Sequence, residues 1–139
     1  TEHPEGHRFI GGVSRAATQH HTICVGDMTQ MRTDSRALLE AGLELSVALW
    51  NEAAETFDWS DLDRYIIHQV SNVHTQAVTA ALGIDAERVP MTFPRYGNIG
   101  PASIPFTLAL AADDLREGDR VGCLGIGSGL NASVIEISW

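Results

Sequence analysis

The longest regular pattern of apolar residues lies between residues 33 and 57. Leucine, valine and tryptophan recur there at helical spacing with alanines between them, which predicts one long helix. Thr33, Asp34 or Ser35 can cap its start, because a short side-chain oxygen satisfies the free amides of a first helical turn. The apolar stripe of this helix is expected to pack in the core.

Two further helices are predicted in the second half of the chain. One runs from about Asn72 to Leu82 and is followed by Gly83, the residue type that commonly ends a helix. The other covers residues 101–115, with Pro105 in its early part, where proline is tolerated.

Short apolar runs predict the strands. The run Tyr65–Ile67 is wholly apolar, which is typical of a strand buried on both faces. Residues 120–126 and 132–137 flank a glycine-rich turn and predict an antiparallel pair. Shorter strand-like runs are Phe9–Gly12, Thr22–Val25 and Val89–Phe93. Strands that alternate with helices predict an α/β fold, a layered mixed five-stranded sheet with helices.

Composition narrows the class of protein. The 139 residues suit one domain, and a net charge of -9 with only nine Lys and Arg argues against nucleic acid binding. No apolar run approaches the ~18–20 residues that span a membrane. Cys24 and Cys123 form no CxxC pair, so a reducing cytoplasm is the expected location. The N-terminus at Thr1 is expected to be a loop, in a chain cut from something longer.

Three motifs place polar or glycine-rich residues directly after apolar runs. They are His68-Gln69-Val70, the stretch Tyr96–Pro105 that contains Asn98, and Gly125–Asn131 with its Gly127-Ser128-Gly129 turn. An imidazole, an amide and an open backbone turn together suit the stabilisation of negative charge on a thioester or enolate oxygen. No cysteine lies where a nucleophile is expected, so the motifs indicate half of an active site.

Each motif also has a structural interpretation. Taken alone, His68 is more often a satisfied histidine at a strand end, and Asn98 is a turn residue that tolerates a left-handed backbone. Gly127-Ser128-Gly129 can be simply a hairpin turn. Their combination in one chain favours a functional site.

Other kinds of site fit the sequence less well. His20 and His21 are adjacent and point apart in a strand, and no other ligand clusters with them, so no metal site is expected. Ser128 lacks the glycine two residues before it that a hydrolase turn needs. No helix follows the Gly127 turn, as a dinucleotide fingerprint would require. Cys24 and Cys123 are expected to be structural.

The chain resembles the thiolase superfamily, and within it the C-terminal half of a ketoacyl synthase III-type condensing enzyme. The motif sequences are most similar to those of the OleA-type acyl-CoA thiolases of long-chain olefin and ketone biosynthesis, and the resemblance extends from about His7 to Trp139. The motifs that carry the resemblance are Gly11–Ala16 with His20-His21, His68–Ser71 with Val73–Thr75, Gly97–Ser103 and Gly125–Asn131.

The resemblance implies roles for the site residues. His68 and Asn98 correspond to the family's catalytic histidine and asparagine. The backbone N–H of Ser128, between Gly127 and Gly129, corresponds to the oxyanion donor. The catalytic cysteine would come from an absent N-terminal half of the same enzyme, so the isolated chain would be inactive.

The resemblance also implies substrates and partners. The reaction would be Claisen condensation of fatty acyl-CoA thioesters to a β-keto product, in lipid metabolism. The enzyme would be a homodimer without a cofactor, since acyl-CoA or an acyl carrier protein is the substrate. In the OleA-type group, the enolate-forming base is a glutamate from the partner subunit's first half.

Two alternatives remain open. A ketoacyl synthase III would condense acyl-CoA with malonyl carrier protein, but many such enzymes have Asn at the position of Ser71 and Arg at that of Val73. The departures favour joining two acyl-CoA molecules without decarboxylation. The second alternative is a stand-alone binding or assembly domain without catalysis, whose exposed apolar face would drive association.

Overall fold

A four-stranded sheet forms the centre of the protein. The computed structural model describes residues 6–57, 59, 61–127 and 129–139. The strands are β1 (Arg8–Ala16), β4 (Arg64–Ile67), β5 (Arg120–Gly127) and β6 (Asn131–Ser138), in the order β1-β6-β5-β4. β4 is parallel to β5, and the other neighbours are antiparallel. The predicted α/β class with a mixed sheet is therefore confirmed.

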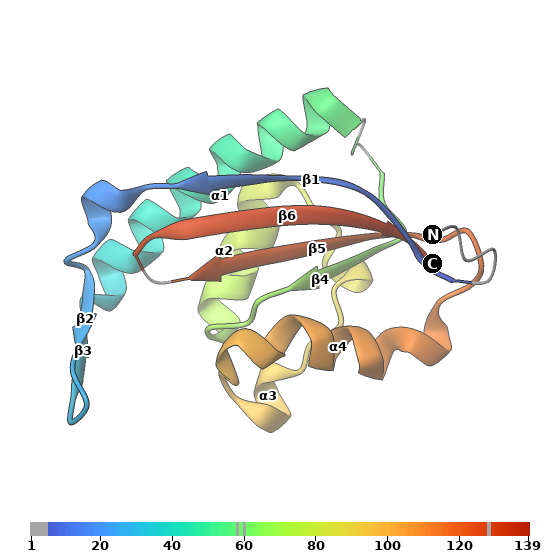
Figure 1. Ribbon diagram of the computed structural model, residues 1–139. Helices are drawn as coiled ribbons and strands as arrows, with labels where there is room; N and C mark the ends of the chain where they lie inside the picture. The colour runs from blue at the N-terminus through green and yellow to red at the C-terminus, as the bar shows by residue number, and fades with distance from the viewer. Residues whose placement is uncertain (1–5, 58, 60, 128) are drawn as a thin grey trace.

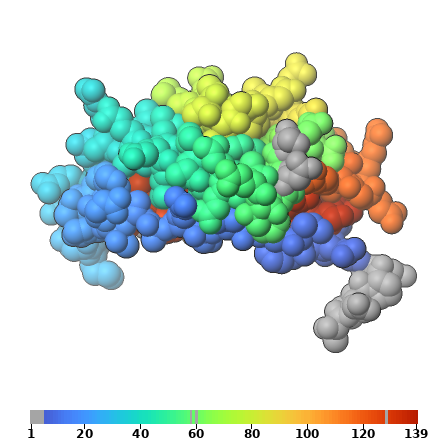
Figure 2. Space-filling view, turned by 90° about the horizontal axis from the view of Figure 1, so that it is seen from above, coloured from blue at the N-terminus to red at the C-terminus, as the bar shows by residue number. Residues whose placement is uncertain are grey.

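Helices cover both faces of this sheet (Figure 1). The helices are α1 (Ser35–Phe57), α2 (Asn72–Leu82), α3 (Phe93–Tyr96) and α4 (Ser103–Ala111). Short 3-10 turns lie at Thr18–His20, Ala86–Arg88, Gly100–Ala102 and Ala112–Asp114. Figure 2, seen from above, shows α1 lying along β1, with α2 on the opposite side of α1 from β1. A separate hairpin of β2 (Cys24–Gly26) and β3 (Met31–Thr33) projects from the end of the molecule where α1 begins.

Side-chain alternation in the strands creates two cores. Tyr65 and Ile67 in β4 belong to the core beneath α1, whereas Ile66 between them belongs to the core beneath α4. In β5, a Cβ on Gly125 would meet Ile104 of α4, while the next residue, Ile126, contacts α1. Successive side chains of a strand point to opposite faces, so consecutive residues reach different helical layers.

The predicted helices are confirmed, and local capping explains their ends. Asp34 is the cap of α1, because its Oδ1 accepts a hydrogen bond from the Ala37 N–H at 3.0 Å. Gly83 ends α2 with a left-handed backbone at φ 66°. The predicted helix over 101–115 is α4 flanked by the two neighbouring 3-10 turns.

The strand count is four in the described sheet, and the prediction of five strands is wrong. Residues 89–93, predicted as a strand, contain no strand: Pro90–Thr92 are irregular and Phe93 begins α3. The predicted strand at Thr22–Val25 overlaps β2, which pairs only in the hairpin. Backbone groups of residues 90–93 bond to the side chain of Gln69, so they do not need a neighbouring strand.

Candidate active site

A cavity of about 570 Å³ lies where the parallel strands β4 and β5 end. Its walls come from four segments: the hairpin with the start of α1, the end of β4 with the start of α2, the loop before α4, and the β5–β6 turn region. In layered α/β sheets, ligands commonly bind beyond the carboxyl ends of the strands. Much of the lining is apolar, including Met31, Leu38, Val70, Ile104 and Ile126.

His68 is the first residue after β4. Its backbone N–H donates to the Leu124 carbonyl at 2.8 Å, which continues the parallel ladder and fixes where the side chain leaves the sheet. The imidazole lines the cavity and is half-buried. Burial lowers the pKa of His68, because the charged ring loses hydration. His68 is therefore biased toward the neutral imidazole, which can donate through one nitrogen and accept through the other.

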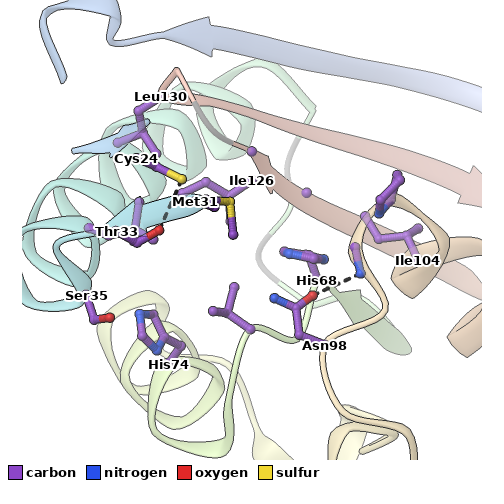
Figure 3. A pocket seen from close by; sticks show the side chains of 16 residues that line it. Cys24, Met31, Thr33, Ser35, His68, His74, Asn98, Ile104, Ile126 and Leu130 are labelled. Carbon is purple, nitrogen blue, oxygen red and sulfur yellow. Dashed lines mark hydrogen bonds between the residues drawn. The ribbon is translucent and has the colours of Figure 1, made fainter. Parts of the chain in front are cut away.

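Asn98 lies in a loop whose glycines adopt left-handed backbone conformations. Gly97 has φ 69° and Gly100 has φ 59°, and a Cβ on either would meet no atom within 4 Å. These glycines are therefore required by backbone conformation and not by crowding. The Asn98 Oδ1 accepts a hydrogen bond from the Gly100 N–H at 2.9 Å. This bond occupies the amide oxygen and leaves Nδ2 as a donor beside His68 in the cavity (Figure 3).

The Gln69 side chain links the segment that contains His68 to the segment that leads to Asn98. It is 1% exposed, and its Oε1 accepts hydrogen bonds from the N–H groups of Thr92 at 2.9 Å and Phe93 at 2.8 Å. Its Nε2 donates to the Pro90 carbonyl at 2.8 Å. The segment that leads to Asn98 is thus held against the residue that follows His68.

The third predicted motif is only partly within the described structure. Gly127 lines the cavity with His68 and Asn98. Gly129 has φ 112° in the turn before β6 and is not among the lining residues. Ser128 lies outside the described residues. The structure therefore gathers His68, Asn98 and Gly127 from three distant segments, and their roles remain predictions.

The sequence interpretation assigned no active-site role to His74 or Cys24, although both line the cavity. His74, in the first turn of α2, lines the cavity, and its Nδ1 lies 2.8 Å from the Ser71 Oγ. The one signal in the sequence that could have indicated His74 was its position six residues after His68, near the start of a predicted helix. Cys24, predicted to be structural, also lines the cavity, and its Sγ accepts a hydrogen bond from Thr33 Oγ1 at 3.2 Å.

Cys123 lies away from the cavity in the core beneath α4. Burial raises the pKa of its thiol to about 11, so it is a poor nucleophile. Across the described residues, no group of three or more His, Cys, Asp or Glu side chains could hold a metal ion. No helix in the described part of the chain is long and apolar enough to cross a membrane.

Comparison with known families shows to which family this chain belongs. Residues 53–139 match the family described as 3-oxoacyl-[acyl-carrier-protein (ACP)] synthase III C terminal. The chain belongs to this synthase III C-terminal family. An acyl-CoA:acyl-CoA alkyltransferase from Xanthomonas campestris is 42% identical over 98% of the chain and 41% of its own length. One from Shewanella oneidensis is 36% identical over 96% of the chain and 42% of its own length.

Solved structures also match the fold of this chain. Xanthomonas campestris OleA with bound lauric acid and lauroyl-CoA matches with a TM-score of 0.93 at 42% identity, over 98% of this chain and 42% of that chain. A 3-oxoacyl-(acyl carrier protein) synthase III from Xanthomonas oryzae gives a TM-score of 0.93 at 42% identity, covering 98% and 41%. The predicted resemblance and thiolase-type fold are confirmed. The chain spans about two fifths of the length of these relatives.

Proposed function

We propose that this chain supplies the histidine–asparagine half of a condensing enzyme that joins two fatty acyl-CoA molecules by Claisen condensation to a β-keto product. The observation that carries the proposal is the Asn98 amide, turned by its bond to Gly100 so that Nδ2 points into the cavity beside His68. Two donors at one point of a largely apolar cavity suit an oxygen that becomes negative.

The proposed chemistry starts with one acyl group bound as a thioester to a cysteine outside these 139 residues. A base removes a proton from the α-carbon of the second acyl thioester, and the resulting enolate attacks the first thioester carbonyl. A carbon–carbon bond forms, the carbon–sulfur bond breaks, and the cysteine leaves as a thiolate. No cofactor enters this sequence.

His68 and Asn98 would donate hydrogen bonds to the enolate oxygen as its charge develops. Removing one preorganised donor of this kind typically costs about 2.7–4 kcal/mol in the transition state. A lowered pKa of His68 favours the neutral ring, which stabilises the oxygen as a hydrogen-bond donor. The Ser128 N–H, with Gly127 and Gly129 on either side, would bind the oxyanion of the acyl-cysteine, a role that rests on the sequence motif.

The partner of the chain in this proposal is the cysteine-bearing N-terminal half of the same enzyme, in a cytoplasmic homodimer that acts in fatty acid and lipid metabolism. The relatives named as acyl-CoA:acyl-CoA alkyltransferases support acyl-CoA as both substrates. The family description and the similarity to a synthase III structure support a second candidate, condensation of acyl-CoA with malonyl carrier protein.

The test is condensation of lauroyl-CoA by the polypeptide that carries these residues together with the cysteine-bearing half. We expect CoA release and a β-keto product, with kcat reduced about 10²–10³-fold in Asn98→Asp, which keeps the oxygen that accepts from Gly100 but loses the donor. Asn51→Asp, at an exposed position on α1, is the matched control and should keep full activity.

Three outcomes would redirect the proposal. Product formation only with malonyl carrier protein, accompanied by carbon dioxide, would favour the synthase III reaction. Equal activity of Asn98→Asp and the parent enzyme would remove Asn98 from the site. Absence of condensation with either substrate pair would leave the binding or assembly domain as the interpretation.

A further inference from the structure

Four buried polar residues from three segments form a closed ring of hydrogen bonds, which we call the polar ring. They are Gln69 after β4, Thr92 before α3, and Ser103 and Thr107 on α4. Their exposed fractions are 1%, 8%, 2% and 0%, in that order. Burying polar groups costs free energy unless each finds a hydrogen-bond partner, so a buried set of this kind holds its segments in one arrangement.

Each member of the polar ring is joined to the next. The Gln69 backbone N–H donates to the Ser103 Oγ at 3.2 Å. Thr107 follows Ser103 by four residues and therefore lies on the same face of α4. The hydroxyl oxygens of Thr107 and Thr92 lie 2.9 Å apart and share a hydrogen bond. The Thr92 N–H then donates back to the Gln69 Oε1 at 2.9 Å, which closes the ring.

Ser103 and Thr107 are the two polar residues of α4. The other residues of this helix, Ile104–Phe106 and Leu108–Ala111, are all apolar. Replacing two bonded polar groups with apolar groups of the same shape can be nearly neutral for stability, so packing alone does not require these hydroxyls. Their position in the polar ring therefore points to a task other than filling the core.

The polar ring holds both ends of the loop that carries Asn98. Residues 93–102 leave the ring at Thr92 and return to it at Ser103. On the other side, the His68 N–H bonds to the sheet, and the next N–H, that of Gln69, turns to Ser103 instead. The ring thus joins the end of β4, which delivers His68, to both ends of the loop that delivers Asn98.

The loop itself depends on these ends for its place. Asn98 is exposed, and so are Pro94–Tyr96 before it. Gly97 and Gly100 have left-handed backbone conformations and no side chains that could pack. The bond from the Gly100 N–H to the Asn98 Oδ1 turns the amide within the loop but does not attach the loop to the rest of the molecule.

We propose that the polar ring is the positioning element of the active site, in which Ser103 and Thr107 hold the Asn98 amide in place beside His68. The proposal rests on the proposed function and adds two positioning residues to it. Neither Ser103 nor Thr107 is among the described residues that line the cavity, so both act on the substrate only through His68 and Asn98. A displacement of about 1 Å at a catalytic group can cost about 10²-fold in rate, which makes such positioning measurable.

Two substitutions at Thr107 separate its hydroxyl from its methyl group. Thr107→Val keeps the shape and loses the hydroxyl, whereas Thr107→Ser keeps the hydroxyl and loses the methyl group. Both are assayed for condensation of lauroyl-CoA in the polypeptide that includes the cysteine-bearing half. We expect Thr107→Val to lower kcat about 10- to 100-fold with KM changed less than about twofold, and Thr107→Ser to retain most of kcat. A residue that served packing alone would give the reverse order.

Thr79 on α2 is the matched control. It is also a buried helical threonine, but its hydroxyl donates within its own helix to the Gln76 carbonyl at 3.0 Å. Thr79→Val should therefore leave kcat unchanged, while Ser103→Ala should lower kcat as Thr107→Val does. Urea unfolding of each variant establishes that the rates are compared among folded enzymes.

An NMR titration of the 139-residue chain gives a measurement that does not require activity. Ser103→Ala releases the Gln69 N–H, so the His68 ring should gain hydration and its pKa should rise toward the ordinary value of 6.5. The side-chain amide signal of Asn98 should shift as well. Thr79→Val should leave both signals as they are in the parent chain.

The outcomes separate this inference from the proposed function. Condensation by the parent enzyme, with Thr107→Val as active as Thr79→Val, would overturn the positioning role while the condensation proposal stands. A lower kcat in Thr107→Ser than in Thr107→Val would overturn it in favour of packing. Absence of condensation by the parent would overturn the proposed function, and the NMR signals would then decide alone. Unmoved His68 and Asn98 signals in Ser103→Ala would overturn the role of the polar ring, and shifted signals would support it.

Discussion

The side-chain oxygen of Gln69 accepts a hydrogen bond from the backbone N–H of Phe93 at 2.8 Å, across 24 positions of the sequence. The same oxygen accepts from the Thr92 N–H, and the amide nitrogen donates to the Pro90 carbonyl. One buried side chain thus replaces a neighbouring strand for this segment. It also sets the distance between the end of β4, where His68 lies, and the loop that holds Asn98.

We expect Gln69→Leu to destabilise the fold and weaken the site. Leucine fills a similar volume but leaves three backbone groups without partners, which should lower the free energy of unfolding by about 2–4 kcal/mol. Urea unfolding measures this change, and Gln76→Leu, on the exposed side of α2, is the control at about 0.5 kcal/mol or less. A loss below 1 kcal/mol for Gln69→Leu, on the order of one ordinary hydrogen bond, would show that another group holds the segment.

The lowered pKa of His68 predicts how stability depends on pH. In the unfolded chain the ring titrates near its ordinary pKa of 6.5, so below that pH the unfolded state binds the proton more readily than the folded state. The free energy of unfolding should therefore fall as pH decreases through 6.5 toward the folded pKa, and this contribution should be constant above 6.5.

The measurement is unfolding between pH 5 and pH 8 for the parent chain and for His68→Gln. The variant should lose the part of the pH dependence that belongs to His68, and an NMR titration of the parent should give a His68 pKa below that in the urea-unfolded chain. Identical pH profiles for the two chains would mean that burial of the His68 ring does not oppose its protonation.

The two cysteines should differ in reactivity toward a thiol reagent. With a pKa of about 11, only about one in a thousand Cys123 side chains is ionised to the thiolate at pH 8. The Cys123 side chain is also only 3% accessible to solvent. Cys24 is half-buried and lines the cavity. We expect one thiol to react in the native chain and two in urea, by mass spectrometry after timed labelling.

Two variants check the assignment of these thiols. Cys24→Ser should make the native chain nearly unreactive, while Cys123→Ser should leave its rate unchanged. Octanoyl-CoA should slow the labelling of Cys24 if the ligand fills the cavity. Rapid labelling of Cys123 in the native chain would contradict its burial beneath α4.

The ion pair between Arg120 and Glu136 should contribute to stability. Glu136 is 3% exposed, and its two carboxylate oxygens accept from Arg120 at 2.8 and 3.2 Å. Glu136→Gln keeps the volume but removes the buried charge opposite the guanidinium, which should cost about 1–3 kcal/mol, because hydrogen bonds to charged groups are the stronger ones.

The exposed pair Arg36–Glu40, an i,i+4 contact on α1, is the comparison. Glu40→Gln should change the free energy of unfolding by about 0.5 kcal/mol or less, since solvent screens both charges. Thermal or urea unfolding of the two variants gives the contrast. Equal effects at Glu136 and Glu40 would mean that burial of Glu136 does not strengthen its pair.

The sequence by itself determined the elements whose causes are local. Apolar spacing and the Asp34 cap specify α1, Gly83 ends α2, and the glycine-rich turn separates the antiparallel strands β5 and β6. The motifs also pointed to His68 and Asn98, which both line the cavity, because a polar residue directly after an apolar run is recognisable within a few residues of chain. These signals depend on backbone conformation and on side chains close in sequence.

The tertiary structure decided what depends on distant partners. Residues 89–93 have the apolar character of a strand, but their backbone groups bond to Gln69, so the sheet has four strands and not five. The place of His74 in the cavity depends on the meeting of α1, α2 and the hairpin. Periodicity reports which face of an element is apolar, whereas a hydrogen-bond partner far along the chain is fixed only when the layers pack.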